Sequence, residues 1–494
     1  MTRNVFAVIL FSLTYATQDS LLYAAQNSLG SSAMDITAYG AEKGGKALCT
    51  TSIQKAIDQC TEAGGGCVVI PSGNWLTGTL VIKNNVELHL AHGATLIAST
   101  NHCDFPTFRP EYRSHTDLNG LNALIYAEKA ENIAITGTGT IDGQGHCQRP
   151  REGKQFRSDK DGRPRNILFV SCRNIRVEGI TLKNSGIWNQ HYLNCEDVIV
   201  DRIIVYNHSN RNNDGIDIDG CRRFILSNSI FDSDDDGVCL KSTGPAPCEH
   251  ISIINCIVSS HCNAIKTGTE STGGFRNITI SNCIVKPSNS KEKVVFGLKE
   301  GITGITVGCV DGGICENINI NNIVIEGTQT PIFVRLGQRN RAHISGATVT
   351  KDSTMRNISI SNITATGCGD QGCAILGLPG NPIRNLHLSN INLTFAGGGS
   401  QEDARRVIEE KLAGYPQPTV WGKLPVYGFF IRNADNVRLQ NLDLQVVEED
   451  QRSPIWLENV NHVEINSISA HKADDEMPLM IRKNVANKTD NISQ

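Results

Sequence analysis

The stretch RNITISNCIV, residues 276–285, has the pattern of two short strands joined by a turn. Ile278 and Ile280 alternate with polar residues, as in a half-buried strand, and Asn282 marks a turn before the next apolar pair. A similar stretch, EHISIINCIV, occupies residues 249–258. A unit this short cannot enclose a core alone, so the stretch predicts a stack of repeated units.

The repeat returns along most of the chain. Its anchor positions are Asn132, Asn174, Asp197, Arg223, His250, Asn277, Asn317, Asn357, Asn385, Asn436 and Asn461. From Asn174 to Asn277 the anchors recur with a nearly even spacing of roughly 25 residues, which is in the range typical of solenoids. Short alternating strands with Asn or Gly turns at this period predict an all-β solenoid whose coils stack about 4.8 Å apart.

Cysteines occupy equivalent places in successive repeats. Five of them lie two residues before an anchor and two lie six residues after one: Cys172, Cys195, Cys221, Cys248 and Cys315, then Cys256 and Cys283. We expect these thiols to stack inside the solenoid as small apolar groups. The total of 17 cysteines is odd, so at least one is unpaired within the chain. We expect a disulfide between Cys368 and Cys373, which share the loop GCGDQGC.

Residues 1–25 have the composition of an export signal. Arg3 precedes an apolar run from Val5 to Ala16, and small residues at Ala24 and Ala25 suit cleavage. The run is short for a bilayer span, and no later segment reaches the length that a span needs. We therefore expect a secreted or periplasmic protein that is not held in a membrane after signal cleavage.

The remaining residues, 26–494, are predicted to form a single domain. Near its start, Thr51 and Gln54 have the spacing of a capping box, and Ile53, Ala56, Ile57 and Cys60 mark one helical face. Such a helix would cap the open end of the solenoid. The largest departures from the period are the loop 146–165 and an insertion at about 396–426. A net charge of -4 argues against a strongly basic nucleic-acid binder.

Acidic residues cluster at one place in the repeat. The steps from Asp214 to the pair Asp235 and Asp236, and from Asp236 to His261, are each close to one coil. We expect the three acids and the histidine to converge on one exposed patch of the solenoid. Hydrolysis of a glycosidic bond needs such a group, because one carboxyl donates a proton while another activates water or attacks the sugar.

Three consecutive motifs carry a resemblance to a known family. NNDG (212–215), DSDDDGVCLKS (232–242) and SSHCNAIKTGTES (259–271) are similar to the active-site motifs of the glycoside hydrolase 28 polygalacturonase family. The segment 34–96 and GTGTIDGQG (137–145) also resemble that family. The resemblance implies a right-handed parallel β-helix that hydrolyses α-glycosidic bonds of galacturonate-containing pectic polysaccharide with inversion, without a cofactor or metal. We expect a monomer.

The same resemblance implies roles for individual residues. Asp235 corresponds to the general acid, Asp214 and Asp236 to the bases that activate water, and His261 to the histidine beside them. Asn212, in the first motif, is expected to bind substrate. The histidine lies in SHCN rather than between glycines, which departs from the family pattern.

A second departure concerns the grip on a substrate carboxylate. The family's Arg-Ile-Lys should fall where this chain has GITV (304–307), so both cations are absent. Candidates to replace them are Lys241, Lys266, Arg335, Arg339 and Arg341. We expect Lys241 to hold a uronic acid, and the site to act at a chain end or on a substituted backbone. Trp188, and Tyr415 with Trp421 in the insertion, could stack on sugars or fill space.

Two other functions fit a solenoid with clustered acids. In a calcium-dependent pectate lyase the aspartates would bind calcium through their oxygens. The histidine one coil from the acids has no calcium-binding role and favours the hydrolase. In a noncatalytic carbohydrate-binding β-helix the acids would be solvated surface groups, which their one-coil spacing argues against.

Overall fold

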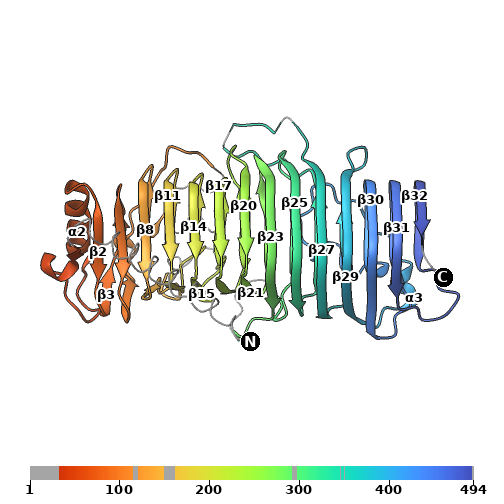
Figure 1. Cartoon of the computed structure of the whole chain (residues 1–494), viewed down its shortest axis with the longest axis horizontal. Coiled ribbons are helices and arrows are strands. Elements are labelled where there is room, and N and C mark those ends of the chain that lie inside the picture. Colours follow the sequence, from red (N-terminus) through yellow and green to blue (C-terminus); the bar gives the residue numbers. More distant parts are fainter. Residues whose placement is uncertain are drawn as a thin grey trace, which may run out of the picture.

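The coils stack in parallel along the whole molecule (Figure 1). The computed structural model describes residues 33–114, 121–148, 162–291, 297–344, 346–349 and 351–491. The predicted signal peptide, residues 1–25, lies outside the described residues. All pairs between the strands named below are parallel, and Arg222 pairs with Glu249, one repeat later. The right-handed parallel β-helix predicted from the sequence is therefore confirmed.

Each coil of the N-terminal half has three strands, one on each of three faces. The first face contains β1 (Met34–Asp35), β2 (Gly66–Ile70), β5 (Val86–Leu90), β8 (Glu131–Gly137), β11 (Arg173–Glu178), β14 (Glu196–Asp201), β17 (Arg222–Ser227) and β20 (Cys248–Ile254). The second contains β3 (Gly73–Thr77), β6 (Ala94–Ala98), β9 (Thr140–Asp142), β12 (Thr181–Lys183), β15 (Ile204–Asn207), β18 (Ile230–Ser233) and β21 (Ile257–Ser260).

The third face carries the acidic motifs. It contains β4 (Leu80–Val81), β7 (Ala123–Glu128), β10 (Arg165–Val170), β13 (Gln190–Leu193), β16 (Ile216–Asp219), β19 (Val238–Ser242), β22 (Asn263–Ser271), β24 (Thr303–Cys309), β26 (Thr330–Leu336) and β28 (Cys373–Leu376). Later strands turn the corner between faces: β23 (Gly274–Lys286), β25 (Ile314–Glu326), β27 (Thr354–Cys368), β29 (Ile383–Gly397), β30 (Val426–Glu448), β31 (Ser453–Ala470) and β32 (Met480–Asn491).

A helix closes the N-terminal end of the stack, as predicted. Helix α2 (Thr50–Glu62) buries Ile53, Ala56, Ile57 and Cys60 against the first coils (Figure 1). The predicted capping box is absent, because the helix begins at Thr50 and Thr51 lies inside its first turn. The side chain of Gln54 binds the backbone of Val81. The other helices are short: η1 (Ile36–Tyr39), η2 (His102–Asp104), α3 (Gln401–Ala404) and η4 (Pro418–Val420). Among the described residues, no helix has the length and hydropathy of a membrane span.

The core is a set of ladders in which like residues stack on like. Ile251, Ile278, Ile318 and Ile358 are paired in register from coil to coil and all are buried. Burying a side chain of this size contributes roughly 1.5–3 kcal/mol. The seven predicted interior cysteines are buried as well. Each coil therefore covers the apolar surface of the one before it.

The predicted disulfide between Cys368 and Cys373 is wrong. Both cysteines are free and buried in the interior cluster. Cys368 ends β27 and Cys373 begins β28, so each side chain points into the core from its own strand. The loop between them does not bring the two thiols together.

The bend near the start of the first-face strands depends on asparagine in successive coils. Asn277, Asn317 and Asn357 have φ values of 54°, 58° and 58°, in the left-handed region that asparagine tolerates. The side-chain amide of Asn317 donates to Asn277 Oδ1 at 2.8 Å, and Asn357 donates to Asn317 Oδ1 at 2.8 Å. The repeated asparagine therefore supplies both the turn and a hydrogen-bonded ladder along the stack.

We predict that Asn317→Ala lowers the free energy of unfolding by about 2–3 kcal/mol and Asn317→Gly by about 1–2 kcal/mol. Both variants lose the two ladder hydrogen bonds, but only alanine resists the left-handed conformation. Urea unfolding of the two variants and the parent protein measures the difference. Equal losses for alanine and glycine would show that the backbone conformation contributes nothing.

Candidate active site

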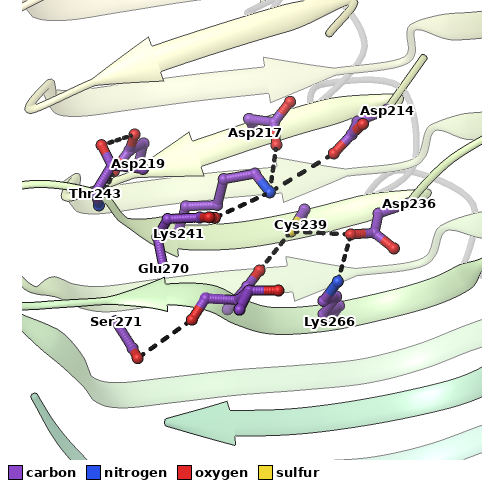
Figure 2. A network of polar contacts seen from close by, with 12 residues as sticks. Asp214, Asp217, Asp219, Asp236, Cys239, Lys241, Thr243, Lys266, Glu270 and Ser271 are labelled. Carbon is purple, nitrogen blue, oxygen red and sulfur yellow. Dashed lines mark hydrogen bonds and ion pairs between the residues drawn. The ribbon is translucent and has the colours of Figure 1, made fainter. Parts of the chain in front are cut away.

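The acidic motifs lie on the outer surface of the third face, where β16, β19 and β22 run side by side (Figure 2). Ile216 and Ile218 point into the core, so Asp217 and Asp219, which alternate with them along the strand, point outward. On β19, Lys241 is paired with Asp219, and on β22, Lys266 is paired with Cys239. Strand alternation and register thus place acids and lysines on one surface.

Glycines let the acid-bearing turns stack closely. The amide of Gly215 donates to the carbonyl of Asp236 at 2.9 Å, and that of Gly237 donates to the carbonyl of Asn263 at 2.9 Å. A Cβ at Gly215 would lie 2.5 Å from the carbonyl oxygen of Gly237. The glycine after each acid in NNDG and DDDG therefore allows the carboxylates of adjacent coils to approach.

Asp236 is held as a carboxylate. Lys266 Nζ lies 2.8 Å from its Oδ2, and the side-chain amide of Asn263 donates to its Oδ1 at 2.6 Å. Burial works to raise the pKa of Asp236, but the charges of Lys266 and Lys241 and these two bonds bring it below its usual value. Asp236 is therefore ionised at neutral pH and can accept a proton.

The pKa of Asp235 is displaced in the opposite direction. Burial, followed by the neighbouring charge of Asp236, raises the pKa of Asp235 to about 6. The side-chain amide of Asn212 donates to Asp235 Oδ2 at 3.4 Å. Asp235 remains partly exposed, whereas Asp236 is buried. Two adjacent carboxyls with pKa values displaced in opposite directions have the properties of an acid and a base.

Lys241 is surrounded by acids. Its Nζ lies 3.7 Å from Asp214, 3.4 Å from Asp217 and 3.6 Å from Glu270 (Figure 2). Its ammonium also lies 4.6 Å from the ring centroid of Trp188. The expectation that Lys241 grips a substrate carboxylate stays a prediction, and the three carboxyl groups that already surround its ammonium group argue against it.

The carboxyls around Lys241 favour their protonated forms, with one exception. Burial, then Asp217 and Asp235, raise the pKa of Asp214 well above its usual range. Burial raises the pKa of Asp217 to about 8. Glu270 is the exception, since Lys241 and Arg341 outweigh its burial and lower its pKa. Asp214, expected to act as a base, is thus less readily ionised than Asp236.

His261 lies beside the acids but is not on an exposed patch. Its ring is buried, and its Nδ1 lies 3.0 Å from Asp234 Oδ1. The ring of His208 contacts it edge-on at 5.0 Å, and His208 Nε2 lies 2.8 Å from Asp232. Of the four predicted catalytic residues, only Asp235 is partly exposed. The expected exposed patch is therefore a largely buried cluster.

Two groups of side chains in the described part of the chain have metal-ligand spacing. One is His208, Asp234 and His261, and the other is Asp214, Asp236 and Cys239. In the second group, the ammonium groups of Lys241 and Lys266 already face the two carboxylates. A thiol and two neighbouring lysines do not match the oxygen ligands that calcium prefers, so this site does not fit the calcium-dependent alternative.

The predicted aromatic and arginine residues have different positions. Trp188 packs against Lys241 and His191, and Trp421 is buried against Phe333. Arg335 is fully buried and donates to the carbonyls of residues 410–412, so it fastens the insertion and does not reach substrate. Tyr415 is 42% exposed, with Lys266 Nζ 5.6 Å from its ring centroid. Tyr415 therefore lies beside Lys266, and its role in binding sugar stays a prediction.

The sequence reasoning missed Asp234, Asn263 and Glu270. The repeat carried a signal for the first two, because Asp234 and Asn263 stand one coil from His261 and Asp236 respectively, and each contacts that partner. Glu270 had no such signal, since β22 has a register irregularity after Thr267.

Comparison with known proteins gives the family. The sequence model of the family described as glycosyl hydrolases family 28 matches residues 60–412. This chain belongs to that family. The resemblance predicted from the three motifs is thus confirmed, and the protein is a glycoside hydrolase.

Individual relatives agree with this assignment. A probable polygalacturonase of Vitis vinifera is 24% identical over 87% of this chain and 88% of its own. An exopolygalacturonase of Zea mays is 23% identical over 80% of this chain and 92% of its own. The crystal structure of a hyperthermoactive exopolygalacturonase from Thermotoga maritima matches with a TM-score of 0.61 and 24% identity, over 74% of this chain and 88% of its own. The structural match supports the β-helix fold.

We predict that turnover falls above pH about 6, because Asp235 loses the proton that it must donate as pH rises through its pKa.

Lys266→Met should move the acidic limb of the pH profile to higher pH, because Asp236 loses the charge that keeps its pKa low. Profiles of kcat measure both limbs. Lys55→Met, on the exposed side of α2, is the control. If the acidic limb of Lys266→Met is unchanged, the ionisation of Asp236 is not what produces that limb.

Proposed function

We propose that this family 28 enzyme hydrolyses α-glycosidic bonds of galacturonate-containing pectic polysaccharide, with inversion, and that it acts at chain ends. The observation that carries the proposal is the pair Asp235 and Asp236, whose pKa values are displaced in opposite directions. The similarity to a probable polygalacturonase of Vitis vinifera and an exopolygalacturonase of Zea mays supports the substrate class. We also propose that residues 1–25 direct export.

In this mechanism Asp235 gives its proton to the glycosidic oxygen as the bond to the anomeric carbon breaks. Asp236 takes a proton from water, and the water oxygen forms the new bond to that carbon from the opposite side. Asp214 belongs to the same cluster, because its carboxyl group lies near the ammonium group of Lys241. That carboxyl group orients the water. One proton leaves Asp235 and one reaches Asp236, and because water attacks directly from the face opposite the departing oxygen, the configuration inverts without a covalent intermediate.

Two fixed segments beside the acids support action at a chain end. On one side, the insertion after β29 is fastened by Arg335 and by Trp421, whose indole nitrogen donates to the carbonyl of Glu409 at 3.0 Å. On the other side, the Tyr112 hydroxyl accepts a hydrogen bond of 2.9 Å from the amide of Ala246, just after β19. We propose that these segments limit the site to the last sugars of a chain, and the exopolygalacturonase of Zea mays among the relatives supports this.

We predict that Asp235→Asn lowers kcat about 100-fold to 10,000-fold on polygalacturonate, because asparagine keeps the shape of the side chain but has no acidic proton. Reducing-end assays measure the rate, and an unchanged melting temperature shows that the fold is retained. Asp58→Asn on the distant helix α2 is the matched control and should keep full activity. Near-normal turnover in Asp235→Asn would remove Asp235 from the role of acid.

We predict that fresh product has inverted anomeric configuration and contains no unsaturated sugar. Proton NMR during the first turnovers reports both properties in one experiment. Retained configuration would require a covalent intermediate, whereas an unsaturated product would identify the lyase alternative.

A further inference from the structure

The third face lacks positive charge one coil beyond Lys266. Lys266 is paired in register with Thr306 on β24, and Gly304 is the other outward position there. The hydroxyl of Thr306 is hydrogen-bonded to that of Thr303 at 2.6 Å. The structure therefore agrees with the sequence that no cation stands at this position.

Most cations near the acids are already committed to protein groups. Lys241 faces three carboxylates, and Lys266 is bound to Asp236. Arg335 donates to backbone carbonyls. Arg341 binds Asp311 through Nη2 at 2.6 Å and Glu270 through Nη1 at 3.1 Å. Each of these four side chains already contacts at least one protein group, which reduces its availability to a substrate anion.

Arg339 is different. It follows β26 and is half-buried, with its guanidinium carbon 5.2 Å from the ring centroid of Tyr415. Its Nη1 is buried and has no hydrogen-bond partner among the described residues. Burial, followed by the charge of Arg341, lowers the pKa of Arg339. A buried donor on a charged group that lacks an acceptor is costly, and an anionic ligand would remove this cost.

Tyr415 connects Arg339 to the catalytic carboxyls. The same ring has Lys266 Nζ 5.6 Å from its centroid, and Lys266 is bound to Asp236. Stacking on an aromatic ring orients a guanidinium and leaves its edge available to an anion. Tyr415 lies in the insertion, beyond residue 412, where the family match ends. The arrangement thus uses a segment that the family match does not include.

We infer that Arg339, supported by the ring of Tyr415, binds the carboxylate of a uronic-acid residue next to the scissile bond, so that the preferred substrate is an unesterified uronate chain. The inference rests on the proposed function. It also assigns to Arg339 the role that was expected of Lys241 from the sequence. The planar guanidinium matches a carboxylate with two parallel hydrogen bonds, which a methyl ester cannot accept with the same charge.

The test is binding to the inactive Asp235→Asn protein, measured by calorimetry with galacturonate oligomers and with their methyl esters. Adding Arg339→Gln should weaken binding of the acid form about tenfold to hundredfold and leave the ester nearly unchanged. Arg339→Lys keeps the charge but not the planar fork and should lie between. Tyr415→Ala should weaken binding of the acid form, while Arg405→Gln, exposed on the same insertion, should not.

Two outcomes overturn the inference while the proposed function stands. One is equal affinity of the Asp235→Asn protein and its Arg339→Gln derivative for the acid form, when the parent enzyme cleaves polygalacturonate. The other is an equal loss for acid and ester, which would indicate a packing role for Arg339. A parent enzyme that cleaves no pectic polysaccharide would overturn the proposed function itself. Melting temperatures of all variants show whether each is folded.

Discussion

Parallel pairing in register is the constraint on which the rest of the molecule depends. Because each coil pairs residue by residue with the next, isoleucine stacks on isoleucine in the core and Asn317 binds Asn277 at the turn. The same rule controls the outer surface, where Asp217 and Cys239 occupy one rung position in successive coils. A shift by one residue would turn the core ladder outward and the acids inward, so the core fixes the site.

Buried charge is the main cost of this arrangement. Several carboxyls share a surface from which much of the water is excluded, and two lysines compensate them. Lys266 serves mainly Asp236, whereas Lys241 is divided among Asp214, Asp217 and Glu270. The unequal division lowers the pKa of Asp236 and leaves Asp235 with a pKa of about 6. The lysines therefore set the protonation states that separate acid from base.

The sequence predicted what depends on period and missed what depends on loops. Coil spacing was enough to foresee the β-helix and the approach of Asp214, Asp235 and Asp236. The same period could not predict that Lys241 is surrounded by acids, because that follows from Glu270 on a strand whose register is irregular. The disulfide between Cys368 and Cys373 failed for a related reason, since strand ends point their side chains inward whatever the length of the loop between them.

The cations that surround the site show why the loss of one motif from a solenoid does not by itself mean that the function of that motif is lost. A linear motif assigns a group to one position on one strand. In stacked coils, side chains from neighbouring coils and from an insertion approach the same point, so a charge lost from one strand can be supplied by another. Arg339 reaches the site from the loop after β26, and Tyr415 reaches it from the insertion that follows β29. The position of a charge on the surface matters more than the strand that supplies it. Loops can therefore change while the core ladder remains fixed.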